Sequence, residues 1–298
     1  MTIIDSHNTS AGDLDKPVAE QWQGVVYSGE SRLKNMPGFL RSAVQDLKAA
    51  RPTMLQFFQR TMVQRYRFSS LGILWAFAPS LITAVVLWAG NINRVIPKGE
   101  ISPAFYGVFG LALGQTFLDG LNSLRTLYTS NLSILRRDNV PLEGIIAGSL
   151  LEVIFNTVVR ILVVIVSLLV FKITPSIVSP LSLLGFLGVA LLGGSVGLIL
   201  APFTALKRDI DNIMNFLPWV FFACTPVFVQ VTKGSLVAHF YQLNPRSWIF
   251  DSTRSLAYGA PGIIWPALVS VPASLLFLSM GWLLCRLWRP YVIERLLT

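Results

Sequence analysis

Charged residues are scarce in this sequence. Only 13% of its 298 residues are Asp, Glu, Lys or Arg, whereas 53% are hydrophobic. An ordinary soluble domain carries about 25% charged residues, and a water-exposed fold of this length could not hide so much apolar surface. The composition therefore excludes an ordinary soluble domain and predicts an all-α protein embedded in lipid.

Side chains that build metal centres or disulfide frameworks are also few. The two cysteines, Cys224 and Cys285, both lie in apolar segments, and the two histidines, His7 and His239, lie far apart. We therefore predict two reduced core cysteines and no metal site.

Signatures of catalysis are missing as well. The sequence has no GxxxxGK[ST] phosphate loop, because the glycine-rich run at 110–116 (GLALGQT) lacks both the spacing and the lysine. No Ser/His/Asp or Cys/His arrangement stands out. We predict that the chain is not an enzyme and binds no cofactor, so that ATP and Mg²⁺ in an ATP-driven process would belong to a separate subunit.

Long apolar runs are abundant, and each is near the ~20 residues that cross a ~30 Å hydrocarbon core. They predict six transmembrane helices near residues 71–89, 104–124, 145–171, 181–206, 213–231 and 263–287. Residues 1–50 are polar and are interpreted as a cytosolic extension before a transmembrane domain at 51–298. Apolar residues at helical spacing predict an interfacial amphipathic helix at 52–68, on the cytosolic leaflet.

Basic residues mark one side of the membrane. If the six predicted helices cross the membrane in alternating directions, twelve of the basic residues that flank them fall on one side of the membrane and six fall on the other. The positive-inside rule then places both termini in the cytoplasm. Because the basic residues form short clusters between spans, the net charge of +9 indicates contact with anionic lipid and no nucleic-acid partner.

The segment between the fifth and sixth runs is apolar but interrupted. Asn244-Pro245 separates two pieces that are each too short to cross a bilayer. They predict short re-entrant helices that dip in from the outer face, with Arg246 and Arg254 near the polar surface. The alternative is an ordinary surface loop with amphipathic helices.

Polar residues inside the predicted spans are expensive and therefore informative. Glu152, Asn156 and Arg160 form one stripe on the third span, and Asp119 lies near the cytosolic end of the second. Such groups predict either a hydrophilic path or an internal ion pair that orders the bundle. Pairs of glycines four residues apart, such as Gly193 and its partner Gly197, predict close helix approach.

Aromatic residues in the spans could line a channel or simply pack the core or an interfacial belt. Sugar rings present flat C–H faces to aromatic rings, so that an aromatic channel would let a glycan slide. The candidates for lining a channel, including the polar stripe, are Trp75, Phe109, Glu152, Asn156, Arg160, Trp219 and Phe222.

Several segments together resemble ABC-2 type permeases of the branch that exports polysaccharide, such as O-antigen, capsule or teichoic acid. The resemblance covers roughly 52–290 and is carried by 65–75 (RYRFSSLGILW) with Pro79, by 131–141 (NLSILRRDNVP), by Arg208-Asp209-Ile210, by Thr225-Pro226 and by Asn244-Pro245. Thr225 stands where serine is expected, which is a conservative departure.

The resemblance implies a homodimer of permeases, in the bacterial inner membrane, that works with an ATP-binding cassette ATPase. The cytosolic loop around Thr126–Arg137 would dock to the ATPase, and Tyr128, Leu132 and Leu135 are spaced to form one helical face. The docking candidates are Tyr128, Asn131, Leu132, Leu135, Arg136 and Arg137.

The same resemblance implies an outer gate in the interrupted segment and a lipid-linked glycan as substrate. The gate candidates are Phe240, Tyr241, Asn244, Pro245 and Trp248. Two alternatives remain open at this point. One is an exporter of a drug or small lipid, and the other is an intramembrane glycan-modifying enzyme that uses the carboxylates of Asp209 and Asp211.

Overall fold

The computed structural model describes residues 45–48, 50–67, 78, 82, 85, 86, 89, 102–135, 140–228, 241, 243–259 and 262–297. All of them belong to one unit, Ala43–Thr298. The predicted first span at 71–89 lies mostly outside the described residues, as do Trp75, Arg136, Arg137 and Phe240.

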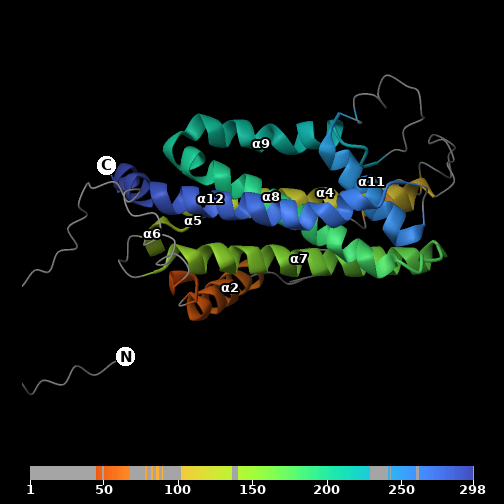
Figure 1. The fold of residues 1–298 in the computed structure, drawn as a ribbon, viewed down its shortest axis with the longest axis horizontal. Helices are drawn as coiled ribbons and strands as arrows, with labels where there is room; N and C mark the ends of the chain where they lie inside the picture. Colours follow the sequence, from red (N-terminus) through yellow and green to blue (C-terminus); the bar gives the residue numbers. More distant parts are fainter. Residues whose placement is uncertain are drawn as a thin grey trace, which may run out of the picture. The chain divides into compact units, whose positions relative to one another are not determined.

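Secondary structure within the described residues is entirely helical, as predicted. The elements, drawn in Figure 1, are α2 (Arg51–Tyr66), α4 (Pro103–Arg125), α5 (Leu127–Ser130), α6 (Leu132–Leu135), α7 (Leu142–Val170), η4 (Ser179–Leu181), α8 (Ser182–Leu206), α9 (Arg208–Ala223), α11 (Pro245–Tyr258) and α12 (Trp265–Leu297).

Three helical segments in the described part are long and apolar enough to cross a membrane: Leu142–Val170, Ser179–Leu206 and Trp265–Leu296. They correspond to the third, fourth and sixth predicted spans. Helix α4 has 23 residues but carries polar side chains that lower its hydropathy. Helix α9 has 16 residues with Pro218 inside it and covers only part of the fifth predicted span. Six spans therefore stay a prediction.

Helix α8 lies at the centre of the unit, with α4 on one side and α12 on the other. Gly193 and Gly197 face the backbone of Phe117 and Leu121 on α4, where a Cβ atom would collide with carbonyl groups. This contact confirms the close approach predicted from the glycine spacing.

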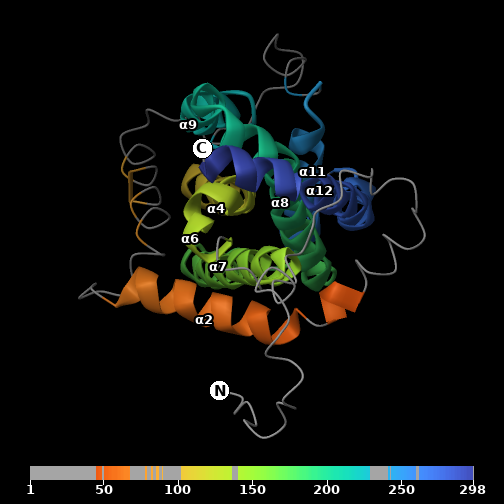
Figure 2. The same cartoon turned by 90° about the vertical axis from the view of Figure 1, so that its left-hand side faces the viewer.

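Helix α2 packs against the first half of α7. Figures 1 and 2 show it crossing α7 steeply near one end of the bundle. Gly144 and Gly148 of α7 receive Thr53 and Phe57 of α2. The helix predicted at 52–68 is thus present, and its position on a membrane surface stays a prediction.

Two apolar clusters form the core. One is built around aromatic rings of α4, α8, α9 and α11, and includes Phe105, Phe109, Phe186 and Phe221. The other joins the end of α4, the short helices α5 and α6, the start of α7 and the ends of α8 and α12. The second cluster therefore holds the predicted cytosolic loop against the bundle.

Candidate functional site

The polar stripe of α7 meets polar side chains of α4. Asp119 Oδ2 accepts hydrogen bonds from Arg160 Nη2 at 2.6 Å and from Asn156 Nδ2 at 3.2 Å. Arg160 Nε also donates to Gln115 Oε1 at 3.3 Å. Glu152, Asn156 and Arg160 are all buried. The predicted stripe is therefore an interhelical network in which charges are paired, as burial in an apolar bundle requires.

Helix α2 completes this network from outside α7. Arg65 forms an ion pair with Glu152 and donates to Asn156 Oδ1 at 3.4 Å. The network thus holds two arginines and two carboxylates. Sequence reasoning placed Arg65 in the predicted interfacial helix and at the start of the 65–75 segment, and no sequence signal links it to a residue 87 positions away.

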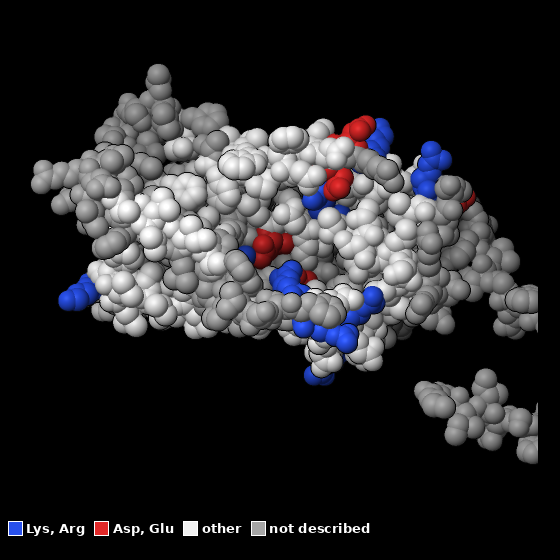
Figure 3. Space-filling model, turned by 180° about the vertical axis from the view of Figure 1, so that it is seen from behind, with Lys and Arg blue, Asp and Glu red and all other residues white. Residues whose placement is uncertain are grey.

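The network is not sealed. The side chains of Arg65 and Asp119 are 44% and 34% exposed, and Nη1 of Arg160 is buried without a hydrogen-bond partner in the described part. Figure 3 shows acidic and basic side chains together in a hollow on one face. The geometry fits the predicted ion pair that orders the helices, while the hydrophilic path stays a prediction, for which the partly exposed Arg65 and Asp119 are the candidates.

The predicted cytosolic loop does not form the single apolar helical face that its spacing suggests. It forms two short helices, α5 and α6, that are separated at Asn131, so that Tyr128, Leu132 and Leu135 do not share one helical face. Tyr128 and Leu135 are buried in the chain's own core. Contrary to the expectation of one partner-facing stripe, Tyr128 and Leu135 serve internal packing, whereas Leu132 is half-buried. Docking of this loop to an ATPase stays a prediction.

Tyr128 anchors the loop to the last helix. Its hydroxyl donates to the carbonyl of Cys285 on α12 at 2.8 Å. Burial raises the pKa of Tyr128 well above the ordinary value for a tyrosine, so the hydroxyl stays a neutral donor. Asn131 Nδ2 donates to the carbonyl of Leu127 at 3.0 Å. This docking candidate therefore stabilises the turn between α5 and α6. The exposed side chains of α5 and α6 are polar, namely Thr129, Ser130 and Ser133.

The base of this loop is tied to the start of α9. Arg125, at the end of α4, forms an ion pair with Asp211. The carbonyl of Arg125 also accepts a hydrogen bond from Thr204 Oγ1 of α8 at 3.0 Å. Asp211, one of the two carboxylates considered for an enzyme, is therefore engaged in a structural contact.

The predicted break at Asn244-Pro245 is the beginning of α11. Asn244 is its N-cap, with Oδ1 accepting from the backbone N–H of Arg246 at 3.1 Å, and Pro245 occupies the first turn. Asn244 Nδ2 also donates to the carbonyl of Cys224 at 2.9 Å. The cap thus holds the turn that follows α9. Among the other gate candidates, Trp248 is 49% exposed and Tyr241 is half-buried.

Arg254 is not near a polar surface, contrary to prediction. It is 2% exposed, and its guanidinium donates to the hydroxyl of Tyr106 at 2.8 Å and to the carbonyls of Pro226 and Val227 at 3.0 and 3.1 Å. Asp251 lies 3.3 Å from it. The sequence signal was available, because Arg254 shares a helical face with buried Phe250 at i−4.

Both ends of α11 therefore hold the same turn. Asn244 binds the carbonyl of Cys224, and Arg254 binds those of Pro226 and Val227. These carbonyls follow the last turn of α9, where intrahelical donors are missing; that of Pro226 also accepts from the hydroxyl of Tyr106 at 3.3 Å. The end of α9 and helix α11 are consequently joined into one structural unit, which we call the α9–α11 clamp.

The aromatic channel candidates divide into three groups. Phe109 is completely buried between Phe105, Phe186 and Tyr258, so core packing, the alternative explanation, accounts for it. Phe222 is half-buried against Phe221. Trp219 is 78% exposed on α9 and stays available to line a pathway.

Comparison with known proteins assigns the chain to a protein family. Residues 54–258 match the family model described as ABC-2 type transporter, whereas a comparison with curated proteins found no match. The matched region includes most of α2, the polar network, the predicted cytosolic loop and the whole of the α9–α11 clamp. Because the match extends over more than half of its length, this chain belongs to the ABC-2 type transporter family and is a membrane permease component of an ABC transporter.

Proposed function

We propose that this permease exports a lipid-linked polysaccharide, of O-antigen or capsule type, across the bacterial inner membrane. In this proposal two copies form the pathway, and a separate ATP-binding subunit hydrolyses ATP. The family supports transport, and the resemblance of residues 65–75 and 131–141 to polysaccharide exporters supports the substrate class.

The observation that carries the glycan proposal is the exposed face of α9. Asn212, Asn215, Phe216 and Trp219 are all exposed there at helical spacing, with the two aromatic rings 69% and 78% accessible. Rings offer stacking surfaces for the C–H faces of sugars, and amides offer hydrogen bonds to hydroxyl groups. Amides on a helix in a membrane favour a water-filled pathway or a protein neighbour over lipid.

The α9–α11 clamp supports a specific form of the outer gate. Since α11 is bonded to the turn after α9 at both of its ends, α11 would not open alone. We expect the end of α9 and α11 to move together when the outer side opens. Trp248, Tyr241 and Phe240 stay gate candidates in this proposal.

In this proposal the ATPase binds the exposed polar side chains of α5 and α6 and not the apolar stripe. Thr129, Ser130 and Ser133 are exposed on α5 and α6, while Tyr128 and Leu135 hold these helices to the bundle. An ATPase that binds α5 and α6 would act on α12 through the hydrogen bond from Tyr128 to the carbonyl of Cys285. Arg136 and Arg137 stay docking candidates.

Two experiments test the substrate. Deletion of the gene should trap polysaccharide in the cytoplasm; normal surface polysaccharide together with new drug sensitivity would instead favour the alternative of a drug or small-lipid exporter.

Trp219→Ala should then lower export severalfold, because one stacking surface is lost. Trp265→Ala is the matched control, since Trp265 is 55% exposed at the beginning of α12. Equal effects of the two substitutions would remove the role of the α9 face.

A further inference from the structure

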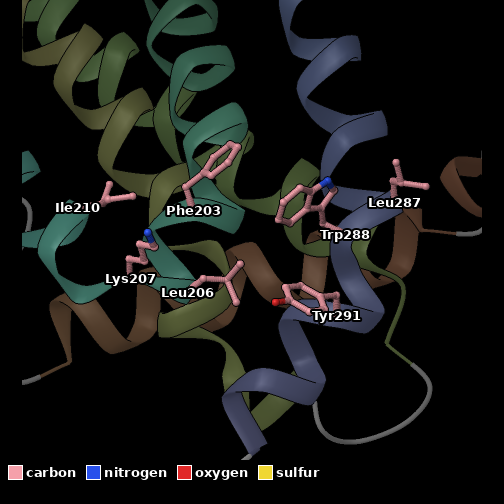
Figure 4. Close-up of a pocket in the computed structure, with 7 residues that line it drawn as sticks. All are labelled: Phe203, Leu206, Lys207, Ile210, Leu287, Trp288 and Tyr291. Carbon is pink, nitrogen blue, oxygen red and sulfur yellow. The ribbon is translucent and has the colours of Figure 1, made fainter.

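A groove of about 590 Å³ opens where α8 ends, α9 begins and α12 passes. Figure 4 shows Phe203 and Leu206 of α8 pointing toward Trp288 and Tyr291 of α12, with Lys207 at one edge. The rings of Phe203 and Trp288 lie 5.6 Å apart between centroids. The groove therefore has apolar, aromatic walls and one basic residue beside them.

The position of the groove relates it to a membrane boundary. Helices α8 and α12 both belong to segments that are long and apolar enough to cross a bilayer. Helix α8 ends at Leu206 because Lys207 adopts an extended backbone conformation, with φ −134° and ψ 111°. Tryptophan, tyrosine and lysine gather at the level of lipid headgroups. The groove thus lies at the height where acyl chains give way to headgroups.

Charge complementarity identifies the occupant. Lys207 is exposed, and no ion pair involves it among the described residues. Asp211, on the first turn of α9, is already paired with Arg125. A basic side chain beside an apolar groove between spans suits a ligand with an anionic head and an apolar tail.

We propose that this groove binds an anionic phospholipid, with its phosphate at Lys207 and an acyl chain between Phe203 and Trp288. Tyr291, which is 56% exposed, closes the groove from the side of α12. The bound lipid would bridge the α8–α9 connection and the end of α12, next to the cluster that holds the cytosolic loop. The proposal depends only on membrane embedding and holds whatever substrate the permease carries.

Native mass spectrometry of the purified full-length protein tests the headgroup contact. The probes are phosphatidylglycerol and phosphatidylcholine with identical acyl chains. We expect the protein to retain phosphatidylglycerol preferentially, and Lys207→Gln to weaken its binding about fivefold, the effect of one basic residue. Lys172→Gln is the matched control, because Lys172 is exposed and follows the last residue of α7, away from the residues that line the groove. Equal retention of both lipids, or no effect of Lys207→Gln, overturns the proposal.

Fluorescence quenching tests the acyl-chain contact. Phosphatidylglycerol brominated on its chains should quench the protein, and Trp288→Phe should remove part of that quenching while keeping an aromatic wall. Quenching that does not change in Trp288→Phe contradicts the groove as the site. A second copy of the chain is the other possible occupant. If the native protein retains no lipid and Lys207→Gln dissociates a dimer, a second copy occupies the groove and the proposal is overturned.

Discussion

Arg254 illustrates how one residue can stabilise a polar contact inside an apolar bundle. A buried guanidinium is costly unless its donors are satisfied. Here its two Nη atoms bind the hydroxyl of Tyr106 and two carbonyls, whereas Nε has no hydrogen-bond partner in the described part. Its Cζ atom also lies 3.7 Å from the centroid of the Tyr106 ring, within range of a cation–π interaction. The same residue therefore connects α4, α11 and the turn after α9.

Replacing Arg254 with glutamine should destabilise the protein strongly. The carbonyl of Val227 would lose the donor that Arg254 supplies, which costs about 1–3 kcal/mol, and the carbonyl of Pro226 would keep only the hydroxyl of Tyr106. We expect a clear decrease in the melting temperature of the purified protein. Arg254→Lys should recover little, because lysine lacks the planar fork. Arg60→Gln, at an exposed position, is the control, and a melting temperature equal to that of this control would contradict the clamp.

Helices α2 and α7 show how an ion pair can place one element against another. Glycines at 144 and 148 allow α2 to approach α7, and the ion pair between Arg65 and Glu152 connects the two helices further along. The glycines set the distance, while the charges select which turn of α7 the end of α2 meets.

A charge-swap cycle tests this arrangement. Arg65→Glu and Glu152→Arg should each lower stability, since a like-charge pair then replaces an attractive one. The double substitution should recover part of the loss. Thermal unfolding of all four proteins measures the coupling; additive losses would mean that the two side chains do not interact.

The tip formed by α5 and α6 has its own prediction. Thr129→Trp and Ser133→Trp should reduce co-purification with the ATPase, because bulky rings would block an exposed surface, without changing membrane insertion. Leu135→Ala is expected to lower stability by about 2–5 kcal/mol instead, as a buried leucine is lost. Unchanged ATPase recovery with both tryptophan variants would count against docking at this tip.

At the scale of the whole molecule, orientation rests on the distribution of basic residues. Arg254, counted on the predicted outer side, and Arg125, counted on the predicted cytosolic side, are both buried in the bundle, so the excess of basic residues on the cytosolic side is unchanged. A reporter that is active only in the periplasm, fused after Thr298, should give no signal. The same reporter inserted between spans, near Lys172, should be active. A strong signal from the C-terminal fusion would reverse the predicted topology.

Sequence by itself determined the class of the protein and much of its helical framework. Apolar runs predicted α4, α7 and α8 to within a few residues, because hydropathy and length are local properties. Asn244-Pro245 predicted the beginning of α11 for the same reason, since capping depends on adjacent residues. The start of α12 was also close, whereas its continuation to Leu297 extends beyond the apolar run.

Only the tertiary structure decided which polar groups meet. Arg254 binds Tyr106 across 148 positions, and Tyr128 binds Cys285 across 157. A spacing rule showed that Glu152, Asn156 and Arg160 share a face, yet it could not supply their partners on α2 and α4. Two residues of the apolar stripe in the predicted cytosolic loop, Tyr128 and Leu135, are buried in the chain's own core, because periodicity identifies a buried face without indicating what buries it. Packing of distant helices settles that choice, and here the chain's own α12 is the partner of Tyr128.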